Sequence, residues 1–124
     1  QGRLYVLPTD LPEQHYERCL VQPIERDYDT YHLSIIDHQS LNYDDFYLAA
    51  KPESYHLALA NGHSRKLKKW FNDEKIPLWW REYLPYLYYK GDLVAIADIW
   101  VKPSFQNRLD IKWQPKALLT WPKN

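Results

Sequence analysis

The 124-residue chain lacks several features that would indicate a function directly. It has no Met, one Cys and 3 Gly, and its 16 Lys and Arg balance 16 Asp and Glu. The lone Cys19 excludes an internal disulfide; it is most simply a core residue and fits a reducing compartment. No glycine lies in a dinucleotide-binding or P-loop pattern, so the chain has no phosphate-cradling loop. No apolar run approaches the roughly 18 residues that a membrane-spanning helix needs.

What the chain does contain is enough apolar surface for a core. It is 45% hydrophobic and 16% aromatic, with 6 Trp and 11 Tyr, which argues against disorder. Its length suits one compact domain over residues 1–124. Because it starts at Gln1 and has no Met, we expect it to be a piece of a larger protein. We expect a location in the cytoplasm, which the lone Cys19 fits.

Short strands dominate the hydrophobic pattern. Period-two runs predict strands at residues 3–7, 31–36, 46–50, 55–60, 86–89, 93–101, 108–114 and 117–121. Helical spacing predicts helices at residues 12–21, 65–74 and 78–83, with Ser64 as the N-cap of the second. Residues 23–30 are expected to form a loop, and Asn61-Gly62 and Lys90-Gly91-Asp92 are expected turns. Short strands around a helical insert at residues 64–84 indicate the α+β class.

The zero net charge conceals two opposed halves. Residues 1–60 hold 4 basic and 10 acidic side chains, a net charge of −6, whereas residues 61–124 hold 12 basic and 6 acidic ones, a net charge of +6. A cluster of cations lies in the helical insert: Arg65, Lys66, Lys68, Lys69, Lys75 and Arg81. Basic patches of this kind are typical of phosphate-binding surfaces.

Two interpretations of the cation cluster compete. A solvated helix face is the simpler one. However, Arg65 and Lys66 would lie in the first helical turn and Asp73 in the last, which is the unfavourable order for the helix dipole. Clustered cations and free amides at a helix start are instead complementary to phosphates. We therefore expect Leu67 and Phe71 to be buried and the cations to face outward.

The stretch from Asn61 to Val101 resembles the C-terminal domain of bacterial tRNA(Ile)-lysidine synthetases. The residues that match the family pattern, in order, are Arg65, Lys66, Leu67, Lys68 and Lys69, then Ile76, Pro77, Trp79 and Arg81, then Pro85, Leu87, Tyr89, Leu93, Val94 and Ala95. Residues 109–114 resemble the last strand of the family. Residues 56–115 match best and residues 1–55 only loosely; Leu59-Ala60 stand where many members have an Arg.

The resemblance implies a noncatalytic tRNA-binding domain with β/β/α layers. In that family, an N-terminal domain uses ATP and Mg to attach lysine to the wobble cytidine of a minor tRNA(Ile), and its SGGxDS-type loop does not occur here. The implied partners are tRNA(Ile) and that catalytic domain, and a homodimer is left open. The cofactors therefore belong to the missing domain, and the six cations are the expected tRNA contacts.

Other functions have weaker support. A protein-interaction module that docks through its oppositely charged halves is the main alternative. The side chains of Asp27, Asp29, Asp37, Asp44 and Asp45 are expected in solvated loops, and neither they nor the five His form a catalytic or metal-binding pattern. Trp70 is expected in the core. Of the adjacent Trp79 and Trp80, one is expected to be exposed.

Overall fold

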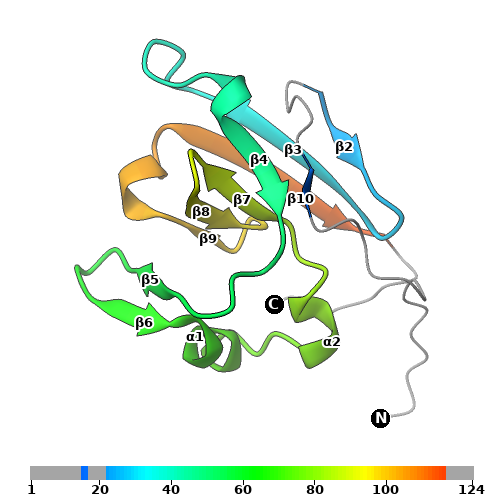
Figure 1. Ribbon diagram of the computed structural model, residues 1–124, viewed down its shortest axis with the longest axis vertical. Coiled ribbons are helices and arrows are strands. Elements are labelled where there is room, and N and C mark those ends of the chain that lie inside the picture. Colours follow the sequence, from blue (N-terminus) through cyan, green and yellow to red (C-terminus); the bar gives the residue numbers. More distant parts are fainter. Residues whose placement is uncertain (1–14, 17–21, 117–124) are drawn as a thin grey trace.

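Antiparallel strands make up most of the computed structural model, which describes residues 15–16 and 22–116 (Figure 1). A five-stranded sheet has the order β1 (His15–Tyr16), β4 (Phe46–Ala49), β7 (Tyr86–Tyr89), β8 (Asp92–Ile96) and β9 (Trp100–Val101). A three-stranded sheet has the order β10 (Leu109–Pro115), β3 (Asp29–Ile35) and β2 (Ile24–Glu25). The strands β5 (His56–Ala58) and β6 (Ser64–Lys66) form a hairpin that is a separate two-stranded sheet.

The helices are short. They are α1 (Leu67–Asp73) and α2 (Leu78–Arg81), with 3-10 turns η1 (Tyr43–Asp45) and η2 (Pro103–Phe105). Figure 1 shows that α1, α2 and the β5–β6 hairpin gather at one end of the molecule. The predicted α+β class is confirmed; the β/β/α layering stays a prediction.

Alternating burial explains the three-stranded sheet. On β3, Tyr31, Leu33 and Ile35 are buried while the residues between them are partly exposed. Their neighbours on β10 follow the same period, because Leu109 pairs with Ile35 and Trp113 with Tyr31. One face of the sheet thus lies in the core.

A buried ion pair crosses this core. The Nε of Arg26 donates to Oδ1 of Asp29 over 2.6 Å, and the indole of Trp113 donates to Oδ2 of Asp29 over 2.7 Å. The guanidinium of Arg26 also donates to the carbonyl of Tyr83 over 2.9 Å. The prediction of a solvated Asp29 is therefore wrong, because this buried carboxylate accepts from Arg26 and Trp113, and Arg26 in turn bonds to the end of the helical segment.

The strands predicted at residues 31–36, 46–50, 55–60, 86–89 and 108–114 are confirmed. The strand predicted at residues 93–101 is instead two strands, because Ala97 has a positive φ of 48° and turns the chain between β8 and β9. Both predicted turns are confirmed. Gly62 has φ 88° between β5 and β6, and Lys90 and Gly91 have φ 49° and 91° between β7 and β8.

Two predictions near the N-terminus are wrong. His15 and Tyr16, predicted to be helical, form β1 and pair with Ala49 and Leu48 of β4. The loop predicted at residues 23–30 contains β2 and the start of β3. In both places a neighbouring strand offers backbone partners, which outweighs weak local preference. The strands predicted at residues 3–7 and 117–121, and Cys19, lie outside the described residues.

The tryptophans of the helical segment anchor it to the core. Trp70 is 5% exposed, which confirms its predicted core position. Of the adjacent pair, Trp80 is fully buried and packs edge-on against Trp113 at 5.7 Å, whereas Trp79 is half-buried. Neither tryptophan is therefore exposed as expected, because Trp79 also packs against the core with part of its surface.

Candidate nucleic-acid interface

The expected start of the basic helix is wrong by two residues. Residues 64–66 pair with β5, with Arg65 opposite Leu57 and Lys66 opposite His56, so they form β6 and the helix begins at Leu67. The amide of Leu67 donates to the carbonyl of Tyr55 over 2.9 Å. Ser64 is therefore not an N-cap. Hydrogen bonds between β6 and the β5 segment supply partners for the backbone before α1, so no capping side chain is needed.

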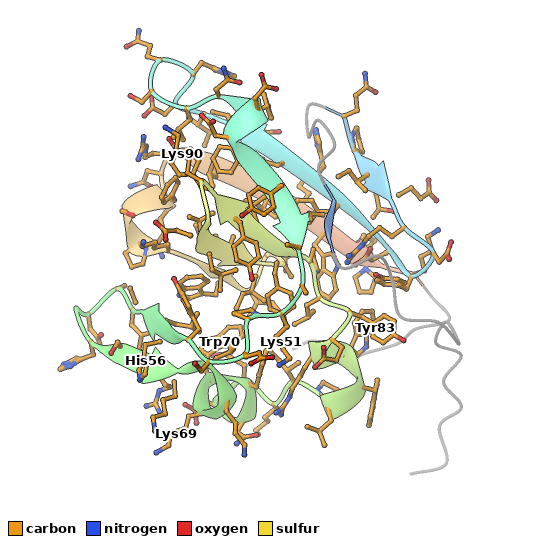
Figure 2. All side chains as sticks on the ribbon, viewed as in Figure 1. Lys51, His56, Lys69, Trp70, Tyr83 and Lys90 are labelled. Carbon is orange, nitrogen blue, oxygen red and sulfur yellow. The ribbon has the colours of Figure 1, made fainter. Side chains whose placement is uncertain are left out.

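The predicted two-faced character of α1 is confirmed. Leu67, Trp70 and Phe71 are at most 5% exposed, whereas Lys68 and Lys69 are exposed. In Figure 2, Lys69 points away from the sheets and Trp70 points toward them. Both lysines lie in the first turn, which has no acidic residue, and the last turn has no basic one. This charge order is unfavourable for the helix. The first-turn cations are Lys68 and Lys69, however, and the predicted Arg65 and Lys66 lie in β6 instead.

Four of the six predicted cations have no ion pair with another described residue. These are Lys66, Lys68, Lys69 and Lys75, and all four are exposed. Three of them lie within four consecutive residues at the junction of β6 and α1. An exposed cation without an acidic partner remains available for an external anion.

The two arginines of the set have partners within the domain. Arg65 forms an ion pair with Asp73 over 3.1 Å, which joins β6 to the last turn of α1. Arg81 donates from Nε to the carbonyl of Ile76 over 2.9 Å and from Nη2 to the side chain of Asn72 over 3.1 Å. Both partners of Arg81 are uncharged, so its positive charge is not neutralised by an ion pair with another described residue.

Lys75 lies in an unusual backbone conformation. Its φ is 59°, its amide donates to the carbonyl of Asn72 over 3.1 Å, and the amide of Ile76 donates to the carbonyl of Phe71 over 3.0 Å. This is the Schellman pattern that ends a helix, at the position where glycine is most common. The turn holds an exposed lysine immediately after α1.

A groove opens beside this cation cluster. It has a volume of about 570 Å³ and lies between residues 51–56, the start of α1, and α2. Lys66, Lys68 and Arg81 contribute to its walls, as does Lys51, which pairs with Glu82 over 3.5 Å. The sequence prediction missed both Lys51 and the groove.

The hydroxyl of Tyr55, on the groove wall, is a hydrogen-bond donor. It donates to the carbonyl of Leu93 over 3.2 Å. Burial, with a smaller contribution from Asp92, raises the pKa of Tyr55 above its ordinary value. The hydroxyl therefore keeps its proton at neutral pH, and the interaction fixes this wall against β8.

Charges of the two sequence halves partly combine in three dimensions. Arg108 pairs with Asp37 over 3.0 Å and Lys116 with Glu25 over 3.0 Å. Desolvation opposes the charged form of Asp37, but hydrogen bonds from Arg108 and Ser40 hold the pKa of its carboxyl below the usual value. The segment between β3 and β4 that carries Asp37 lies at the end of the molecule opposite α1 (Figure 1). The cations of β6 and α1 therefore face away from this acidic segment.

Within residues 15–16 and 22–116, no three His, Cys, Asp or Glu side chains are arranged to hold a metal ion. None of the helices in this part of the chain has the length and apolar character to cross a bilayer.

Fold and site together define a small α+β domain with a cation-rich end. The chain belongs to the family described as the TilS substrate C-terminal domain, whose model matches residues 49–114, more than half of the chain. The match contains all six predicted cations and the residues that line the groove. The resemblance seen in the sequence is confirmed.

Curated relatives carry the name tRNA(Ile)-lysidine synthase. The protein of Vibrio parahaemolyticus serotype O3:K6 (strain RIMD 2210633) is 44% identical over 45 residues, which are 36% of this chain and 10% of that protein. The protein of Serratia proteamaculans (strain 568) is 35% identical over 66 residues, 49% of this chain and 15% of that protein. The chain thus matches 10% and 15% of the length of these two relatives.

Proposed function

We propose that this domain is the noncatalytic tRNA-binding part of a tRNA(Ile)-lysidine synthase and that it holds tRNA(Ile) by its phosphates. Family membership and the names of the relatives support the parent protein. The observation that carries the binding role is the exposed set Lys66, Lys68 and Lys69, which has no acidic partner among the described residues.

The contacts act mainly through charge. A lysine that neutralises an RNA phosphate releases a condensed counterion, so each contact strengthens binding most at low salt. Lys75 extends the cation cluster beyond the end of α1, and Arg65 and Arg81 add to the local positive potential. Phosphate contacts position a nucleic acid without reading its sequence. The isolated chain is therefore expected to bind tRNA weakly, with strong salt dependence and little sequence preference.

Catalysis belongs to a domain outside this sequence. The parent enzyme, by this proposal, acts in the cytoplasm and ligates lysine to the wobble cytidine of tRNA(Ile) with ATP and Mg held by its N-terminal domain. The present domain contributes affinity and orientation for the tRNA, and the catalytic domain is its neighbour in the same protein.

Charge reversal of two lysines tests the proposal. The double variant Lys68→Glu, Lys69→Glu is expected to bind tRNA far more weakly at low salt, with a salt dependence (log K against log salt) shallower by roughly 2. A matched control, Lys90→Glu with Lys112→Glu, makes the same charge change at two exposed positions on β10 and the β7–β8 turn. Fluorescence anisotropy with labelled tRNA at several salt concentrations measures both quantities.

Equal losses in the two double variants would contradict a localised interface. Unchanged affinity of the Lys68, Lys69 variant would refute the proposal altogether. Gel filtration separates it from the docking alternative, because self-association without any tRNA shift supports a protein-interaction module.

A further inference from the structure

Three contacts fix the position of the planar guanidinium group of Arg81. Hydrogen bonds to the carbonyl of Ile76 and the side chain of Asn72 fix two of its nitrogens, and its central carbon lies over the ring of Phe71, 4.9 Å from the centroid. Phe71 is only 3% exposed, so its ring supports the guanidinium from the core side. Arg81 also lines the groove and is half-buried, so the groove gives access to this group.

An apolar side chain that lines the same groove is exposed to solvent. Leu78, the first residue of α2, is 72% exposed, and Ile36 is the other large aliphatic residue that is strongly exposed among the described residues. One exposed leucine alone needs no explanation. Here it borders a groove of about 570 Å³, a volume typical of small-ligand sites, together with the guanidinium of Arg81.

The groove is also lined by lysines. Lys66 and Lys68 have no ion pair with another described residue, whereas Lys51 is paired with Glu82. Glu53 and Glu82 also line the groove, and Lys51 offsets the charge of Glu82. Beside these carboxylates the groove has a flat cationic surface, an apolar edge and two ammonium groups that have no ion pair with another described residue. Those are the three features that complement a planar base attached to a phosphate, since unpaired bases stack on arginine planes and phosphates attract lysines.

We propose that this groove binds one unpaired nucleotide of the bound RNA. Its base stacks on the guanidinium of Arg81 against Leu78, and its phosphate lies near Lys66 and Lys68. A base inside a duplex presents only its edge, so the groove selects a nucleotide at an end, a bulge or a loop. The inference rests on the proposed RNA-binding function and adds the kind of RNA element that is recognised.

Three RNA hairpins with the same duplex test it on the 124-residue chain. One is blunt, one carries a single unpaired 3′ nucleotide with the fluorescent base 2-aminopurine, and one carries an abasic nucleotide at that position. We expect the 2-aminopurine hairpin to bind at least about five-fold more tightly than the abasic one, and its fluorescence to be quenched on binding. Leu78→Ala should abolish this advantage while affinity for the blunt hairpin persists, and Arg81→Lys should abolish the advantage and also weaken binding of the blunt hairpin.

Two controls keep the outcome specific. Ile36→Ala removes an exposed aliphatic residue elsewhere and should leave the advantage intact. Leu78 is exposed, so its variant should keep the wild-type unfolding temperature, which makes it decisive if Arg81→Lys destabilises the domain. The Lys68→Glu, Lys69→Glu variant should weaken binding of all three hairpins.

The possible failures are distinguishable. If the blunt hairpin binds but the base gives no advantage and no quenching, this inference is overturned and the proposed function stands. If no hairpin and no tRNA binds at low salt, the proposed function fails first. Displacement of the 2-aminopurine by a short polyglutamate peptide at similar concentration would assign the groove to acidic peptides and also overturn the inference.

Discussion

Removal of one acidic group is expected to strengthen RNA binding. In the wild-type protein, Asp73 holds Arg65 over 3.1 Å at the surface, with the two side chains 52% and 44% exposed. The substitution Asp73→Asn releases Arg65 beside Lys66 and adds a fifth unpaired cation to the four at this end. A pair this exposed contributes only about 0–1 kcal/mol to stability, so the fold should tolerate the change.

The size of the effect follows from counterion release. One added phosphate contact makes the slope of log K against log salt steeper by about 0.9, which corresponds to roughly eight-fold tighter binding at 0.1 M salt when the 1 M affinity is unchanged. Anisotropy titrations of labelled tRNA between about 0.05 and 0.3 M salt, a range in which the Debye length is on the order of 10 Å, would measure the slope.

A matched variant separates local from global charge. Asp110→Asn makes the same charge change on β10, where Asp110 lies 3.8 Å from Lys112. It should leave the slope unchanged. A slope for Asp73→Asn that equals that of the wild type, or an equal gain in both variants, would refute the idea that Arg65 is withheld from the RNA by its ion pair.

Two further predictions concern stability. Asp29→Asn leaves the buried Arg26 without its counter-charge and should lower the free energy of unfolding by about 3–5 kcal/mol in urea denaturation; a loss below about 1 kcal/mol would show that the pair is not needed. Burial, and then Tyr47 and Tyr55, raise the pKa of Tyr88 to about 12 from its ordinary value near 10. The protonated hydroxyl of Tyr88 therefore contributes to stability fully below pH 10, and this contribution is lost as the pH rises through 12. In urea denaturation, the free energy of unfolding of Tyr88→Phe should depend less on pH between 10 and 12 than that of the wild type. An identical pH dependence would contradict this assignment.

Much of the sheet structure is predictable because it depends on local sequence. On β3, burial of one face imposes the alternation of Tyr31, Leu33 and Ile35, and a turn such as Asn61-Gly62 requires the positive φ that glycine adopts readily. The edge strands β1 and β2 have two residues each and carry no period at all. The position of β1 is determined by its partner β4, which is distant in sequence. The strand β2 pairs with the neighbouring β3 across a short turn, but two residues are too few for an alternation to show.

In the candidate site, too, local features are predictable from the sequence and contacts between separate elements are not. The helical period places Lys68 and Lys69 outward, and the structure has them there. The helical period does not predict the ion pair of Arg65 with Asp73 or the hydrogen bond of Arg81 with Asn72, because these contacts depend on where α1 and α2 pack. The groove was missed for a related reason. One of its walls comes from residues 51–56, which precede the basic stretch and have a different composition.

The pairing of β3 with β10 also has a kinetic consequence. Asp29 pairs with Pro115 and Ile35 with Leu109, so the two strands enclose nearly the whole of the matched family region. Closing so long a loop loses much chain entropy before any contact compensates, whereas the β5–β6 hairpin and α1 form from neighbouring residues. We expect the hairpin and helix to assemble early and the β3–β10 ladder to close in the rate-limiting step of folding.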